Sequence, residues 1–146
     1  MSRTSRFPHL RDGSSQDAGA LIALDSVAAI DPGRIMQIGD WLAHGGVQVA
    51  EQDGKVVGYL VTHQHFFGEA FIEMLMVARE RRSQGIGAIL LRHAIARRGG
   101  GKLFTSTNAS NIGMQRLLTT HGFVGSGIVH GLDEGDPELI YRFAED

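Results

Sequence analysis

The sequence predicts an α+β or α/β fold in which helices pack on one mixed β-sheet. Two observations carry this prediction. Apolar residues follow helical spacing through Arg34–Ala43, and they alternate with a period of two from Val47 onward. In addition, the apolar run Phe71–Val77 leads through a glycine-bearing turn into a helical stretch, Gly85–Arg98, which is typical of a crossover between parallel strands.

Length and composition bound the domain count and the function classes. A chain of 146 residues suits one domain, residues 1–146, with one hydrophobic core. Hydrophobic and charged contents of 42% and 21% are typical of soluble globular proteins, and a net charge of -2 predicts no attraction to nucleic acid. The absence of cysteine excludes disulfides and a cysteine nucleophile. Because no apolar run reaches the ~18 residues of a membrane span and no secretory leader is visible, we expect a cytoplasmic protein without membrane contact.

The N-terminal third predicts one short strand and two helices. Pro8 places the strand at Phe7–Leu10 on an edge or bend of the sheet. The polar residues before Ala18 are typical of a helix start, so a helix is expected over Ala18–Val27. A second helix is expected over Arg34–Ala43, with Pro32 just inside its start.

The middle of the chain predicts three consecutive strands. The first begins at Val47, and Asp53-Gly54 is a strong signal for a two-residue hairpin turn. Lys55–Phe67 is then the returning strand, and the chain turns again into a third strand, Ala70–Val77.

The C-terminal part predicts a second parallel pairing and a final hairpin. Lys102–Thr107 is expected to pair parallel to Ala70–Val77, across the helix between them. The next helix runs from a cap at Asn108–Asn111 to His121, with Gly122 as the residue after its end. Two strands complete the order βααβββαβαββ, and an acidic turn joins them: Phe123–Leu132, Asp133–Pro137 and Glu138–Phe143.

The turn Arg82-Ser83-Gln84-Gly85-Ile86-Gly87 is the most informative segment. A strand, a glycine turn and a helix start can hold a phosphate, because free N–H groups point out of the first helical turn and the helix dipole favours an anion. A plain helix start that contains glycine is the alternative. No Lys follows Gly87, and Leu90 stands where a dinucleotide fingerprint needs its third glycine, so the common nucleotide folds are disfavoured.

Motifs on both sides of this turn indicate a family. Leu75-Met76-Val77 precede it, and Asn108, Asn111 and Gly122-Phe123 follow it. This order resembles the GNAT N-acetyltransferase superfamily over roughly residues 46–143. The resemblance implies a mostly antiparallel sheet of about seven strands with about four helices and a central parallel pair that splays for the cofactor.

The resemblance also implies acetyl-CoA as co-substrate and no metal. The strand end would pair with the pantetheine arm, the glycine turn would cradle the pyrophosphate, and an N–H near Val77 would polarise the thioester. The implied cofactor-binding residues are Leu75, Met76, Val77, Arg82, Ser83, Gln84, Gly85, Ile86, Gly87, Ala88, Asn108 and Asn111. A plain N-cap is the alternative role of Asn111.

Glu73 is the candidate general base. It lies on the same strand face as Leu75 and Val77 and resembles the base of polyamine-type members, although a carboxylate that only binds the acceptor's charge is the alternative. Leu118 stands where the family usually has the Tyr that protonates the leaving thiolate. Water, His121 or Tyr141 would then supply that proton.

These residues predict a cytoplasmic N-acetyltransferase in which an amine attacks acetyl-CoA directly. The acceptor would be a small-molecule amine or a Lys or N-terminal amine. The acidic turn would either lie beside this acceptor or be an ordinary solvated turn. His63 and His65 share a strand face but lack a third metal ligand, so we expect surface or acceptor-pocket roles. The alternatives are a non-catalytic acyl-CoA-binding module and an O-acyl or other acyl transferase. Dimers are frequent in the superfamily, so a homodimer is one expected assembly.

Overall fold

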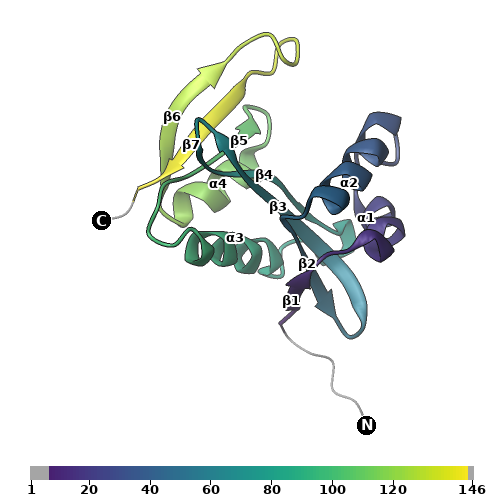
Figure 1. Cartoon of the computed structure of the whole chain (residues 1–146). Helices are drawn as coiled ribbons and strands as arrows, with labels where there is room; N and C mark the ends of the chain where they lie inside the picture. The colour runs from purple at the N-terminus through teal and green to yellow at the C-terminus, as the bar shows by residue number, and fades with distance from the viewer. Residues whose placement is uncertain (1–6, 145–146) are drawn as a thin grey trace. The chain divides into compact units, whose positions relative to one another are not determined.

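The computed structural model describes residues 7–144, and its elements follow the order that the sequence predicts (Figure 1). The strands are β1 His9–Asp12, β2 Val47–Gln52, β3 Lys55–Phe66, β4 Glu69–Val77, β5 Leu103–Asn108, β6 Phe123–Val129 and β7 Glu138–Phe143. The helices are α1 Ala18–Leu24, α2 Pro32–His44, α3 Ile86–Arg97 and α4 Ile112–Thr120, with short 3-10 turns η1 Ser15–Asp17 and η2 Arg79–Arg81. No helix among the described residues has the length and apolar content that crossing a membrane requires.

The strands form one mixed sheet in the order β1-β2-β3-β4-β5-β7-β6. The β1–β2, β2–β3, β5–β7 and β6–β7 pairings are antiparallel. The predicted parallel pair is confirmed, because Ala70–Ile72 of β4 lies in register with Leu103–Thr105 of β5. The α+β fold with a mostly antiparallel, seven-stranded sheet and four α-helices is therefore confirmed within residues 7–144.

The chain divides into two compact units, each with its own internal contacts. The first comprises the residues up to Thr62 together with Met74–Leu90, and the second comprises His63–Glu73 together with the residues from Leu91 onward. Strands β3 and β4 and helix α3 each pass from one unit to the other along the chain. One domain over residues 1–146 stays a prediction.

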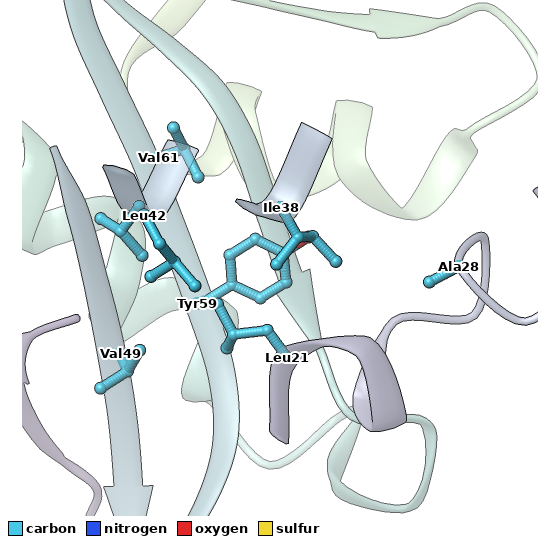
Figure 2. Packing of buried hydrophobic residues seen from close by; sticks show 8 residues of the cluster. Leu21, Ala28, Ile38, Leu42, Val49, Tyr59 and Val61 are labelled. Atoms are coloured by element: carbon cyan, nitrogen blue, oxygen red, sulfur yellow. The ribbon is translucent and has the colours of Figure 1, made fainter. Parts of the chain in front are cut away.

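The first unit is built around Tyr59, which is fully buried on β3. Figure 2 shows its ring among apolar side chains from α1, α2, β2 and β3. The buried members of this cluster are Leu21, Ala28, Ile38, Leu42, Val47, Val49, Tyr59 and Val61. Met74 and Met76 of β4 also pack against it. Because strand neighbours point to opposite faces, Gly58 faces the other side, where it meets Ile86 and Leu90 of α3.

Some boundaries differ from the predicted ones, and side-chain hydrogen bonds explain one of them while strand register explains another. Helix α1 ends at Leu24 rather than Val27, because the Asp25 carboxylate accepts from the N–H groups of Val27 and Ala28. Strand β6 ends at Val129 rather than Leu132, since its register with β7 ends at Val129 and Glu138.

The second unit holds the final hairpin and the turn that follows β5. Phe123 of β6 packs edge to face on Phe143 of β7, with ring centroids 5.5 Å apart. The predicted C′ role of Gly122 is confirmed, because it follows α4 with a φ of 90°, a conformation that favours glycine.

Candidate functional site

The segment from β4 to α3 forms an exposed loop with unusual backbone conformations. Arg82 is extended, and Ser83 and Gly85 adopt positive φ angles of 66° and 85°. The side chains from Arg82 to Gln84 are exposed. Because Ser83 is not glycine, its left-handed conformation costs free energy, and such conformations concentrate at ligand-binding turns.

The first turn of α3 presents N–H groups that lack helical partners. The first helical hydrogen bond runs from the N–H of Ile89 to the carbonyl of Gly85, at 3.1 Å. The N–H groups of Ile86, Gly87 and Ala88 therefore precede the first intrahelical donor. Together with the dipole of a helix twelve residues long, they form a cradle of N–H groups that could hold a phosphate, and this role stays a prediction.

Close packing anchors this cradle to the sheet within the first unit. The side chain of Ile86 is 2% exposed, and that of Leu90 is fully buried. A Cβ atom on Gly58 would lie 2.9 Å from the carbonyl oxygen of Met76 and 3.3 Å from Leu90 Cδ1. Glycine at position 58 thus lets β3 approach the end of β4 and the start of α3 together.

The predicted pantetheine segment, Leu75-Met76-Val77, lies at the end of β4, where its side chains are half-buried. The strand end is held because Ala78 N–H donates to Val57 O at 2.8 Å. Arg82 folds back on it, with Nε donating to Val77 O at 3.3 Å. The predicted loop residues and strand end are therefore neighbours within one unit.

Glu73, the candidate base, is exposed on β4 and pairs with a histidine of β3. Its Oε2 lies 3.1 Å from His63 Nε2. The His63 ring stacks on His65 and on Phe71, each with a centroid separation of 5.4 Å. No group of three or more metal-ligating side chains occurs within residues 7–144.

Asn108 and Asn111 serve local structure in the second unit. Asn111 Oδ1 accepts from Met114 N–H at 3.1 Å, so its N-cap role is confirmed. Asn108 Nδ2 donates to Asp133 Oδ2 at 3.0 Å and to Asp136 O at 3.3 Å. The predicted roles of both residues at the cofactor stay predictions.

The acidic turn is more structural than its composition indicates. Asp136 accepts from both the N–H and the hydroxyl of Ser110, at 2.9 and 2.6 Å, and Asp133 accepts from Asn108. Two of its carboxylates thus bind the turn to the end of β5 and to the segment that precedes α4. This arrangement favours the plainer interpretation of the turn.

The two side chains that are candidate proton donors for a leaving thiolate, His121 and Tyr141, are engaged or buried, and so is Leu118 at the usual Tyr position. Leu118 is fully buried in α4. His121 caps that helix, with Nδ1 2.8 Å from Leu117 O. Tyr141 is 8% exposed on β7.

A buried ion pair near β4 was missed from the sequence. The Asp25 carboxylate is fully buried and accepts from Tyr59 Oη at 2.5 Å and from Arg34 Nη1 at 3.0 Å. Burial acts to raise the pKa of Asp25, but these hydrogen bonds outweigh it and hold the pKa below its ordinary value. Arg34 Nη1 also lies 3.8 Å from Met74 Sδ. A lone carboxylate within the apolar segment Leu21–Ile30 was the available signal, since such a group is rarely buried without a partner.

Comparisons with known proteins agree with this geometry. The profile of the Acetyltransferase (GNAT) family matches residues 24–123. A GNAT-family acetyltransferase from Bacillus cereus ATCC 10987 superposes with a TM-score of 0.84 at 30% identity, covering 92% of this chain and 95% of that one. No curated protein matches the chain in sequence.

Two solved structures with a similar fold and lower sequence identity contain ligands. Arabidopsis thaliana Naa50, in complex with the bisubstrate analogue CoA-Ac-MVNAL, shares 17% identity, with a TM-score of 0.73 and coverages of 94% and 99%. A putative streptothricin acetyltransferase from Bacillus anthracis str. Ames, in complex with acetyl coenzyme A, shares 17% identity, with a TM-score of 0.60 and coverages of 66% and 60%. At this identity the likeness concerns the fold. The family profile and the Bacillus cereus relative, taken with the loop between β4 and α3, show that the chain belongs to the GNAT acetyltransferase family.

Proposed function

We propose that this protein transfers the acetyl group of acetyl-CoA to an amine by direct attack. The observation that carries the proposal is the loop between β4 and α3, with its two positive φ angles and its free N–H groups at Ile86–Ala88. The complexes of the two proteins of similar fold with acetyl coenzyme A and with a CoA-containing analogue support this choice of co-substrate.

The loop and the strand end would bind different parts of the cofactor. Backbone N–H groups between Ser83 and Ala88 would hold the pyrophosphate, and a Cβ-free Gly87 would let it approach the backbone. Backbone groups of Leu75, Met76 and Val77 would pair with the pantetheine amides, which would complete the hydrogen bonding of the strand end. The N–H that polarises the thioester carbonyl would come from the same end of β4.

Glu73 would act as the general base. An alkylamine has a pKa near ~10.4, so it arrives protonated and must lose a proton before it attacks. The amine nitrogen then forms a bond to the acetyl carbon, and the carbon–sulfur bond breaks with its electron pair going to the thiolate of CoA. Glu73 Oε1 takes the first proton of the ammonium before the attack, and the second proton, which the nitrogen loses as the amide forms, passes through water to the thiolate.

A non-catalytic acyl-CoA-binding module is the second candidate, favoured by the buried Leu118 where the family usually has a Tyr acid. Steady thiol release from acetyl-CoA in the presence of an amine would exclude it. An O-acyl or longer-chain transferase would instead prefer alcohols or longer acyl chains in the same assay.

Two measurements test the proposal. Acetyl-CoA at a hundred times its Kd should stabilise the fold by about 2.7 kcal/mol, seen as a rise in Tm. Thiol release should then be followed with spermidine, kanamycin and a lysine-containing peptide, and the chain adds no thiol background because it has no cysteine. A protein that acetyl-CoA does not stabilise would contradict cofactor binding.

Matched variants locate the cofactor site and the base. Gly87→Val should raise the KM for acetyl-CoA strongly, because it places a branched side chain against the pyrophosphate. Gly39→Val is the control, since an added Cβ at Gly39 in α2 meets nothing within 4 Å. Glu73→Gln should lower kcat, most severely at low pH. An unchanged pH profile would remove Glu73 from the role of base.

A further inference from the structure

We infer that His63 is a positioning residue that holds the Glu73 carboxylate in one orientation for proton transfer. The inference rests on the proposed function, in which Glu73 is the general base. His63 and Glu73 lie on neighbouring segments of the second unit, at the β3–β4 hairpin. Their contact joins a ring nitrogen to one carboxylate oxygen, Nε2 to Oε2, at 3.1 Å.

The partner atoms determine which nitrogen of His63 carries the proton. The backbone N–H of His65 donates to His63 Nδ1 at 3.0 Å. Because a backbone N–H only donates, Nδ1 must accept, and the neutral ring then carries its proton on Nε2. That proton points at Glu73 Oε2, so His63 donates to the carboxylate.

Aromatic packing holds the ring in this position. His63 stacks on both His65 and Phe71, with interplanar angles of 19° and 28°. Phe71 in turn stacks on Phe66 at 4.9 Å, and Phe66 packs on Phe104 at 5.0 Å. The imidazole therefore has little freedom to rotate, and its hydrogen bond limits the rotation of the Glu73 carboxylate.

The same contacts exclude His63 as the base itself. Its Nδ1 lone pair is used by the His65 N–H, and its Nε2 carries the proton donated to Glu73. Glu73 keeps Oε1, which has no partner within residues 7–144. His63 thus occupies one oxygen of a half-exposed carboxylate and leaves the other for the acceptor amine. Without this restraint Glu73 would be a mobile strand side chain, 35% exposed.

The test compares four single variants and one double variant, each assayed with acetyl-CoA and the amine of the panel that releases thiol fastest. His63→Ala should lower kcat about tenfold with little change in the KM for acetyl-CoA, since it removes one hydrogen bond to a charged group. His63→Gln should recover most of kcat, because its amide N–H can reach the same oxygen. His44→Ala is the matched control, because it removes an exposed histidine of α2 in the first unit, whose Nδ1 lies 2.7 Å from Asp40 O. It should leave kcat near the wild-type value.

The fourth variant separates this inference from the proposed function. If Glu73→Gln lowers kcat, His63→Ala should add no further loss in the Glu73→Gln background, since both act through one group. If Glu73→Gln leaves kcat unchanged, the role of Glu73 fails, and the positioning role fails with it. If Glu73→Gln lowers kcat but His63→Ala does not, only the positioning role is overturned.

A spectroscopic measurement tests the geometry without any acceptor. Long-range 1H–15N correlation spectra of the free protein at neutral pH should show His63 as the Nε2–H tautomer, assigned by the loss of its signals in His63→Gln. An Nδ1–H tautomer would overturn the inference even if no amine of the panel reacts.

Discussion

Gly58→Ala is the substitution that most directly tests how the loop is anchored. The new Cβ would lie 2.9 Å from the carbonyl oxygen of Met76, about 0.5 Å closer than the 3.4 Å at which ordinary contact begins. It would also lie slightly too close to Leu90 Cδ1, at 3.3 Å, and in ordinary contact with Ile86 Cγ2, at 3.5 Å. The carbonyl belongs to a strand, so it cannot rotate away as a flexible side chain would.

Relief of this clash requires β3, the end of β4 and α3 to separate slightly. Overpacking of this kind costs about 1–3 kcal/mol, which corresponds to a fall in Tm of roughly 3–10 °C for a chain of this length. Under the proposed function, the shifted backbone of Met76 should also raise the KM for acetyl-CoA. Differential scanning calorimetry and the thiol-release assay measure the two effects.

Gly39→Ala is the matched control for this experiment. An added Cβ at Gly39 meets nothing within 4 Å, and the residue lies inside α2 without a positive φ. Alanine should therefore stabilise the helix by about 0.5–1 kcal/mol, so the two variants are expected to change Tm in opposite directions. Equal melting temperatures for Gly58→Ala and the wild type would refute the argument that β3 needs glycine there.

Three further outcomes follow from the buried charges and from the loop. Asp25→Ala should lower the free energy of unfolding by about 3–5 kcal/mol, because it leaves Arg34, whose side chain is 14% exposed, without its carboxylate; urea denaturation measures this. Hydrogen bonds from charged or phenolic partners hold the pKa values of Asp17 and Asp25 below their ordinary values. The stability that these two carboxylates contribute is therefore present above pH ~4 and is lost as the pH falls further. Acid titration of Asp17→Asn by circular dichroism should therefore show a flatter decline than that of the wild type. Arg82→Ala should change the free energy of unfolding by less than about 0.5 kcal/mol, since its bond to Val77 O is exposed, while the KM for acetyl-CoA rises.

Local signals in the sequence predicted much of the fold. Strand β7 has the predicted bounds, Glu138–Phe143, and the turn before β3 has positive φ angles at Asp53 and Gly54, as Asp-Gly turns require. The parallel β4–β5 pair was predictable because a helix separates the two strands. In the first two cases the determining residues lie close together in the sequence, and in the third the pairing follows from the strand–helix–strand order.

The features that were missed depend on contacts between distant residues. Asp25 and Tyr59, which share a buried hydrogen bond, are 34 positions apart in the sequence. The pairing of His63 with Glu73 depends on the register of the β3–β4 hairpin, which strand alternation alone leaves undetermined. Such contacts carry no periodic pattern, so only the folded chain reveals them. The cytoplasmic location and the homodimer stay predictions.

The geometry around α4 bears on how the leaving thiolate is neutralised. His121 Nδ1 is bonded to Leu117 O, so the neutral ring keeps its proton there, and Nε2 faces Arg92 Nη1 at 3.4 Å as an acceptor. Releasing that proton would break the cap of the helix. Leu118 is fully buried and has no proton to give. A thiol has a pKa near ~8.5, so CoA can leave as the thiolate and take its proton from water. The absence of a Tyr acid at Leu118 is therefore compatible with turnover, so thiol release must decide between the enzyme and the non-catalytic module that Leu118 favours.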